Sequence, residues 1–269
     1  MTVDFAAMKA KAKGSKEEGM CAVILGAGQA GKSTLIGTLG VPTLIIHTAD
    51  ESHSVTSAKI FNKEITGLCI NDGCGPDEAM QKLDDILSSP DLFDHFKAVA
   101  IDSFSSIEML IKQTAWLDNF CKSSSGKRDK YREPEAVLTR LQSIINTASD
   151  YRKKGGHVIC TLPCHVKSQD GDGMAEVVEP VLSTYGTANA VPRMFSTVLL
   201  VSHTQVDGEI KRALVFDTKV QKVSKDLGGN VKKLLNFAPC VRGLSDEDTP
   251  TAFPPDLKKL VEFIKEAKK

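Results

Sequence analysis

The sequence predicts an α/β fold in which a mostly parallel sheet carries helices on both of its faces. Two short apolar runs, residues 43–46 and 98–101, are typical of strands that are buried on both sides. Segments with helical periodicity separate such runs, as crossover connections between parallel strands require. A chain of 269 residues suits one large domain of this class with short additions.

The individual elements are predicted in chain order from apolar periodicity and from the glycines and prolines that interrupt it. The predicted helices are residues 3–13, 33–40, 77–87, 107–120, 137–152 and 257–268. The predicted strands are residues 20–25, 43–46, 98–101, 157–162, 197–201 and 213–216. The last two strands are expected to form an antiparallel hairpin around Asp207-Gly208, and residues 121–135 and 167–184 are predicted loops.

A glycine-rich loop joins the first predicted strand to the helix after it. Its sequence, GAGQAGKS, matches the pattern G-x-x-x-x-G-K-[ST], in which glycines let several backbone N–H groups point at one phosphate group. Lys32 is expected to reach the β- and γ-phosphates of ATP, and Ser33 to bind Mg²⁺ through its hydroxyl. The predicted nucleotide-binding residues are Gly26, Ala27, Gly28, Gln29, Ala30, Gly31, Lys32, Ser33 and Thr34.

Carboxylates follow two of the predicted strands. Asp102 ends the third strand and is expected to hold Mg²⁺ through water. Ser103 comes next, so a glutamate that activates water must come from elsewhere, or hydrolysis is poor. The second strand leads to Asp50 and Glu51, and neighbouring parallel strands end at one edge of a sheet. Either residue could therefore orient the attacking water, and the alternative is a solvated pair of loop acids.

His165 follows the fourth predicted strand. A polar group at this place could sense the γ-phosphate and pass its state to the following loop. The alternative is a loop histidine without a special role.

The order of these parts resembles the core of RecA-like ATPases. It looks most like the RecA-like ATPases of phages, a group that includes single-strand annealing and recombination ATPases. The resemblance covers about residues 21–216, and only the phosphate-binding loop (P-loop) is highly specific. The supporting segments are residues 46–51, 99–103, 186–190 and 195–200. The resemblance implies Mg²⁺-dependent ATP hydrolysis. His165 fits the family's sensor position, which is commonly Gln or His.

The resemblance also divides the chain. With the helical patterns at the two ends, the expected parts are a helical extension at residues 1–19, a RecA-like core at 20–245 and a tail with an amphipathic helix at 246–269. In RecA the segments after the third and fourth strands bind single-stranded DNA, and their counterparts are residues 118–135 and 167–190. The residues predicted to contact DNA are Lys122, Lys127, Arg128, Lys130, Tyr131 and Arg132. Cations with one aromatic ring suit phosphates and stacking bases, although a solvated surface loop is the alternative.

RecA-like ATPases usually work as rings or filaments in which a basic residue completes the neighbour's site. Self-association is therefore expected, and Lys219, Lys222 and Lys225 lie where such a residue could be. An exposed basic face is an equally good interpretation of these lysines.

Composition limits the partners and the compartment. Lys and Arg number 34, as do Asp and Glu, so no overall charge draws the chain to nucleic acid or membranes. Seven scattered cysteines indicate reduced intracellular thiols. No apolar stretch approaches the roughly 18 residues of a membrane span, and the N-terminus lacks an apolar signal segment. We expect a cytoplasmic protein, in the host cytoplasm if a phage encodes it.

Two other functions remain open from the sequence. The first is a nucleotide kinase, which needs a lid with arginines that grip phosphates. The second is an assembly or regulatory protein that is gated by ATP and binds no DNA. Phosphoryl transfer to a nucleoside monophosphate would indicate the first, and tight ATP binding without turnover the second.

Overall fold

The computed structural model describes residues 18–123, 126–168, 176–206, 209–215, 240–241 and 252–267. The predicted helix at residues 3–13 and the turn at Asp207-Gly208 lie outside the described residues, as do Lys219, Lys222 and Lys225. Within the described ranges, no helix has the length and apolar character needed to cross a membrane.

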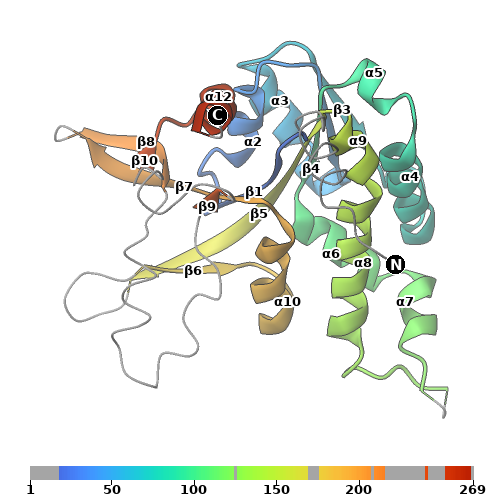
Figure 1. Ribbon diagram of the computed structural model, residues 1–269. Helices are drawn as coiled ribbons and strands as arrows, with labels where there is room; N and C mark the ends of the chain where they lie inside the picture. Colours follow the sequence, from blue (N-terminus) through green and yellow to red (C-terminus); the bar gives the residue numbers. More distant parts are fainter. Residues whose placement is uncertain are drawn as a thin grey trace, which may run out of the picture.

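A twisted sheet runs through the centre of the molecule (Figure 1). Six strands lie parallel in the order β7, β1, β5, β4, β2 and β3. Their bounds are Cys21–Gly26 (β1), Thr43–His47 (β2), Ile65–Cys69 (β3), Ala98–Asp102 (β4), His157–Ser168 (β5) and Thr197–Val206 (β7). Antiparallel pairing adds Glu209–Val215 (β8), Cys240–Val241 (β9) and Ala252–Phe253 (β10). The mostly parallel sheet and its late antiparallel hairpin are thus confirmed.

Helices cover both faces of this sheet (Figure 1). On one face lie Lys32–Gly37 (α2), His53–Lys59 (α3) and Leu257–Ala267 (α12). On the other lie Pro76–Ser88 (α4), Phe104–Lys112 (α6), Ala115–Phe120 (α7), Glu133–Thr147 (α8) and Ser149–Lys153 (α9). The other described helices are Ala49–Glu51 (η1), Leu92–His95 (α5), Tyr185–Ala190 (α10) and Val191–Met194 (η2).

Alternate strand residues supply two separate cores, one on each face of the sheet. In β1, Val23 and Leu25 pack with the α4, α6 and α8 side, whereas Ala22 and Ile24 pack with the α2 and α12 side. Both sets are fully buried, which explains why these strands are continuously apolar in sequence. Helix α12 belongs to the second core, because Leu257 and Leu260 are fully buried in it.

Two long predicted helices are each divided into two. The helix predicted at residues 107–120 starts earlier, at Phe104, and stops at Lys112. A new helix follows because the Thr114 side chain accepts a hydrogen bond from the N–H of Leu117, which caps α7. The helix predicted at 137–152 likewise starts at Glu133, with a proline in its first turn, and gives way to α9 after residue 148.

Helix α2, which follows the P-loop, is shorter than predicted and ends at Gly37 rather than Gly40. A Cβ atom on Gly37 would lie 2.2 Å from the carbonyl oxygen of Ala58 in α3. Glycine at this position therefore lets α2 and α3 pack against each other closely enough to hold the helix behind the phosphate-binding loop.

The predicted loop at residues 167–184 is partly a strand. Strand β5 continues to Ser168, and Glu176–Pro180 (β6) pairs with it antiparallel, with Val166 opposite Val178. The β-branched pair Val177-Val178 favours an extended backbone, but the acidic residues around it made this segment look like a surface loop. The extra ribbon runs out beyond the main sheet (Figure 1).

Candidate nucleotide-binding site

The P-loop lies between the end of β1 and the start of α2. It is exposed from Ala27 to Gln29, and Gln29 has a positive φ of 61°. Gly31 has φ 93°, a backbone conformation that side chains with a Cβ rarely adopt. The path of the backbone thus requires the glycine at position 31.

Lys32 folds back over this loop. Its ammonium group donates hydrogen bonds to the carbonyl oxygens of Gly26, at 3.0 Å, and Ala27, at 2.9 Å. Burial lowers the pKa of Lys32, while the nearby charges of Asp102, Cys164 and Glu51 oppose that change by raising the pKa. A half-buried cation held by two carbonyl oxygens is well placed to bind anionic phosphate groups.

Asp102 joins β4 to the neighbouring strand β5 and to the first turn of α2. The Ser33 hydroxyl donates to Oδ2 of Asp102 at 2.6 Å, and the Thr161 hydroxyl donates to Oδ1. This contact arises because β5, which carries Thr161, lies between β1 and β4 in the sheet. Asp102 is only 3% exposed, so its carboxylate is fixed by these partners. Hydroxyl and carboxylate oxygens are the ligands Mg²⁺ prefers, and Ser33 and Asp102 therefore fit this ion.

Sequence reasoning missed Thr161. The signal was present, because Thr161 is a polar residue inside the apolar run that forms β5, one strand away from Asp102. A hydroxyl that is buried among apolar side chains needs a hydrogen-bond partner. For Thr161 this partner is the carboxylate of Asp102, at the end of the neighbouring strand β4.

The two adjacent acids of the second strand have different surroundings. Oε1 of the half-buried Glu51 accepts hydrogen bonds from the hydroxyls of Ser103, at 3.1 Å, and Ser106, at 3.3 Å. Asp50 is exposed and lines a hollow of about 520 Å³, together with Ser106 and Lys112. Glu51 therefore faces the segment that follows Asp102, and Asp50 faces the hollow between η1 and α6.

His165 lies near the site in the chain but is not joined to it. It stands on β5 opposite Glu179 of β6, and its side chain is exposed. No hydrogen bond links His165 to the described residues of the P-loop. Its role as a sensor remains a prediction.

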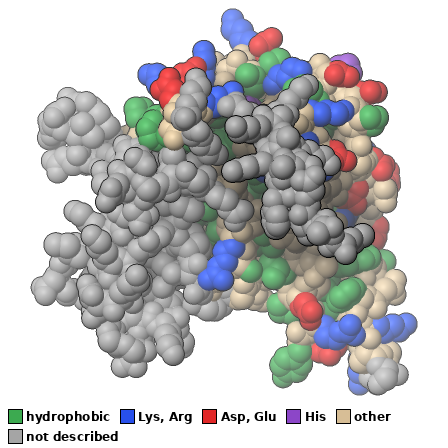
Figure 2. All heavy atoms as spheres, viewed as in Figure 1, with side chains coloured by type: hydrophobic (Ala, Val, Ile, Leu, Met, Phe, Trp, Pro, Cys, Tyr) green, Lys and Arg blue, Asp and Glu red, His purple; other side chains and the backbone are tan. Residues whose placement is uncertain are grey.

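The predicted DNA-contacting residues cluster between α7 and α8. Lys122, Lys127 and Lys130 are exposed, and Tyr131 is 96% exposed. Arg128 instead forms ion pairs inside the segment, described next. Figure 2 shows basic and hydrophobic side chains next to each other at the end of the molecule where α7 and α8 meet.

Arg128 and Arg132 hold this segment in place. The guanidinium group of Arg128 contacts Asp118 at 2.8 Å and Glu133 at 3.0 Å. Arg132 lies over the ring of Phe120, with 5.4 Å between the guanidinium carbon and the ring centroid. The basic segment is thus anchored at both of its ends.

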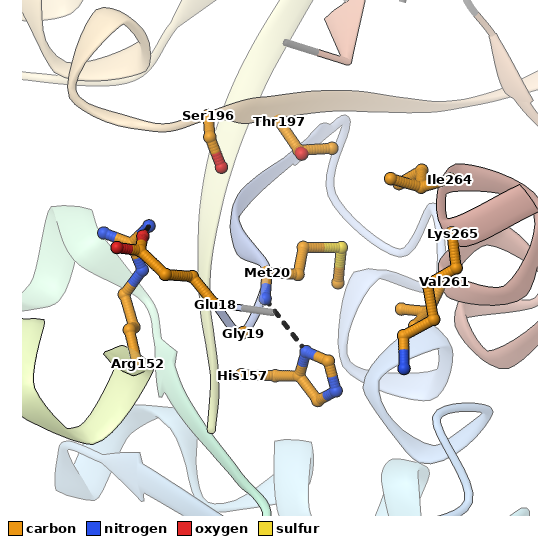
Figure 3. A pocket seen from close by; sticks show the side chains of 10 residues that line it. All are labelled: Glu18, Gly19, Met20, Arg152, His157, Ser196, Thr197, Val261, Ile264 and Lys265. Atoms are coloured by element: carbon orange, nitrogen blue, oxygen red, sulfur yellow. Dashed lines mark hydrogen bonds and ion pairs between the residues drawn. The ribbon is translucent and has the colours of Figure 1, made fainter. Parts of the chain in front are cut away.

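A second hollow, of about 340 Å³, opens at the amino ends of the parallel strands (Figure 3). Met20, His157 and Thr197 line it where β1, β5 and β7 begin, whereas the P-loop follows the end of β1. Lys265 of α12 closes one side. This hollow is therefore separate from the nucleotide site.

The P-loop, Lys32 and the hydrogen-bonded Ser33–Asp102 pair define a P-loop nucleotide-binding protein of the ATPase class. The model of a family described as AAA domain matches residues 18–226, and the chain belongs to this family. No curated protein matches the sequence. The flagellar accessory protein FlaH from Methanocaldococcus jannaschii is a similar solved structure, with 12% identity, 80% of this chain and 84% of that chain covered, and a TM-score of 0.37. A likeness of this size carries no argument about function.

Proposed function

We propose that this protein binds ATP with Mg²⁺ and hydrolyses it, and that hydrolysis is coupled to binding of single-stranded DNA in recombination or strand annealing. The hydrogen-bonded pair of Ser33 and Asp102 beside Lys32 is the observation that carries the catalytic part. When bound, Mg²⁺ neutralises charge on the β- and γ-phosphates. Ser33 and Asp102 would hold it, and Lys32 would bind the phosphates.

Glu51 is the better candidate to orient the attacking water. The hydroxyls of Ser103 and Ser106 hold one of its carboxylate oxygens, and the other, which accepts no bond from the described residues, could contact a water molecule. Burial lowers the pKa of Lys32, and Glu51 is among the nearby charges that oppose this change, so its carboxylate lies near the phosphate-binding lysine. Asp50 has no such contact with the described residues of the P-loop.

The DNA part of the proposal is supported by the segment between α7 and α8. Lys127, Lys130 and Tyr131 are exposed there, and Trp116 and Phe120 are partly exposed, with ring centroids 5.4 Å apart. Lysines attract the phosphates of a strand, and exposed rings offer surfaces for its bases. Arg128 contributes mainly by shaping the segment, because its charge is already paired.

Self-association into a ring or filament is the remaining part of the proposal. Ile60 and Phe61 follow α3 and are 74% and 60% exposed, which is unusual for two adjacent large apolar residues. Sedimentation of the protein with and without ATP checks this part. A single monomeric species up to high concentration in both conditions would contradict it.

The main experiment measures ATP hydrolysis with and without single-stranded DNA at low salt. We expect DNA to stimulate turnover of the natural protein and Lys32→Ala to abolish turnover. The triple variant Lys127→Ala, Lys130→Ala, Tyr131→Ala should keep basal turnover and lose the stimulation. Lys63→Ala removes an exposed lysine between α3 and β3, outside the α7–α8 segment, and is the control for loss of a surface lysine.

The outcomes separate the alternatives. If ATP turnover requires Lys32 but does not change with DNA, the ATPase part of the proposal is supported and the DNA part is contradicted. Phosphate transfer to a nucleoside monophosphate would indicate a kinase, although the described lining of the 520 Å³ hollow contains Lys112 and no arginine. Tight ATP binding without turnover would indicate an assembly or regulatory protein.

A further inference from the structure

Arg212 of β8 lies against the P-loop. A Cβ atom placed on Gly31 would lie 2.5 Å from Nη1, 2.8 Å from Cζ and 3.2 Å from Nε of Arg212. The guanidinium group therefore packs on the last glycine of the loop, directly before Lys32. Gly31 is required for two reasons, its positive φ and the space that this arginine takes.

The sheet explains how a residue so late in the chain reaches the loop. Strand β7 pairs with β1 on one side and with β8 on the other, and Arg212 stands opposite His203 in the β7–β8 pair. Neighbouring strands are about 4.8 Å apart, so β8 lies roughly 10 Å from β1. Only a long side chain can cross this distance to the P-loop.

The guanidinium group of Arg212 has no acidic partner among the described side chains. Among the residues whose side chains the structure describes, no carboxylate lies within ion-pairing distance of it. Lys32, the next residue after Gly31, adds a second cation to the same loop. Two cations that converge on one glycine-rich loop favour an anion with several charges. A guanidinium group can also donate two parallel hydrogen bonds to phosphate oxygens.

We propose that Arg212 binds the phosphate groups of the nucleotide held in the P-loop of its own chain. This inference rests on the proposed ATP site and adds a basic contact from β8 in the same subunit. It is distinct from the expectation that a neighbouring subunit supplies a basic residue.

The test compares Arg212→Ala and Arg212→Lys with the full-length natural protein. Affinity is measured for a fluorescent ATP analogue, and unlabelled ATP or inorganic tripolyphosphate is used as the competitor. Lys259→Ala removes an exposed cation of α12 and is the charge-matched control. The melting temperature of each nucleotide-free variant is measured in parallel.

We expect Arg212→Ala to weaken ATP binding by about 10- to 100-fold, the usual effect of losing hydrogen bonds to a charged group. Competition by tripolyphosphate should weaken similarly, which locates the effect at the phosphates. Arg212→Lys should restore part of the affinity, since an ammonium group keeps the positive charge but cannot donate the two parallel hydrogen bonds of a guanidinium group. The melting temperature without nucleotide should stay close to that of the natural protein, because Arg212 has no described ion pair to lose.

Natural affinity in Arg212→Ala would overturn the inference. So would weaker binding that comes with a large fall in melting temperature and no rescue by lysine, because a structural role predicts that result. If Lys32→Ala loses binding while Arg212→Ala retains it, only the inference about Arg212 fails. A natural protein that binds no nucleotide would contradict the ATP site and this inference together.

Discussion

Asp50 and Glu51 are adjacent in the chain, yet their carboxylates face different surroundings. The turn of η1 directs Glu51 to the hydroxyls of Ser103 and Ser106 and leaves Asp50 exposed at the hollow between η1 and α6. A one-residue step along a short helix rotates a side chain by about a third of a turn. The choice between two neighbouring acids thus depends on local backbone geometry.

Exchanging each carboxylate for its amide separates the two residues. We expect Glu51→Gln to lower kcat for ATP hydrolysis by about a hundredfold or more with little change in KM, because an amide orients water without accepting its proton. Asp50→Asn should stay within about threefold of the natural enzyme. Steady-state kinetics on both variants provide the measurement. A larger loss in Asp50→Asn would assign the water to the other acid.

Sequence alone located the residues of the site that belong to short patterns. Lys32 and Ser33 belong to one motif, and Asp102 ends a strand that is recognisable by its apolar run. Thr161 and Arg212 escaped because they reach the site from β5 and β8, and contacts between strands far apart in the chain leave no local pattern. A search for polar residues in buried strands would have found Thr161 but not Arg212.

Helix α6 makes polar contacts to other segments at its start and near its middle. At its start, Ser103 and Ser106 bind Glu51. Farther along, the buried Glu108 accepts hydrogen bonds from the backbone N–H and the hydroxyl of Ser183, in the segment after β6. Helix α6 therefore connects the acid proposed to orient water with the segment that leads toward α10.

Removing the carboxylate of Glu108 should destabilise the fold. Glu108 is 3% exposed, and Glu108→Ala removes the hydrogen bonds that its carboxylate accepts from Ser183, at a cost of about 1.5–3 kcal/mol in the free energy of unfolding. Glu108→Gln keeps one acceptor oxygen and should lose about half as much. Urea unfolding measures both, with the exposed Glu262→Ala as control. Equal stability of Glu108→Ala and the control would show that Ser183 finds other partners.

The sequence predicted buried elements more reliably than exposed ones. Strands β1, β2 and β4 were located to within a residue or two, because burial on both faces makes them continuously apolar. The edge strand β3 was missed, since its exposed residues and Gly67 break the apolar run. Gly67 is needed there because a Cβ would lie 2.5 Å from the Val55 side chain of α3.

Functional polar groups lie at both ends of the parallel strands. The carboxyl ends of the parallel strands carry the P-loop, Asp102 and Glu51, while the amino ends carry His157 in the second hollow (Figure 3). At the amino ends, the N–H of Met20 donates a hydrogen bond to Nδ1 of His157 at 3.0 Å. This bond ties the start of β1 to the start of β5 and requires a neutral imidazole acceptor.

His157 should make the stability of the whole fold sensitive to mild acid. Burial, with a smaller contribution from Lys265, lowers the pKa of His157 from 6.5 to about 4. Between these values the unfolded chain binds a proton that the folded protein does not. The contribution of His157 is therefore fully present above pH 6.5 and is lost as the pH falls toward 4. At pH 5 the loss amounts to roughly 2 kcal/mol relative to pH 7.5.

The variant His157→Asn tests this linkage, because its side-chain oxygen can accept the bond from Met20 and cannot be protonated. Urea unfolding at pH 7.5 and pH 5 should show a smaller acid loss than in the natural protein, by about 2 kcal/mol. The exposed His95→Asn is the control and should keep the natural pH dependence. If His157→Asn and the natural protein lose the same free energy, protonation of His157 does not govern the acid response, and other groups must account for it.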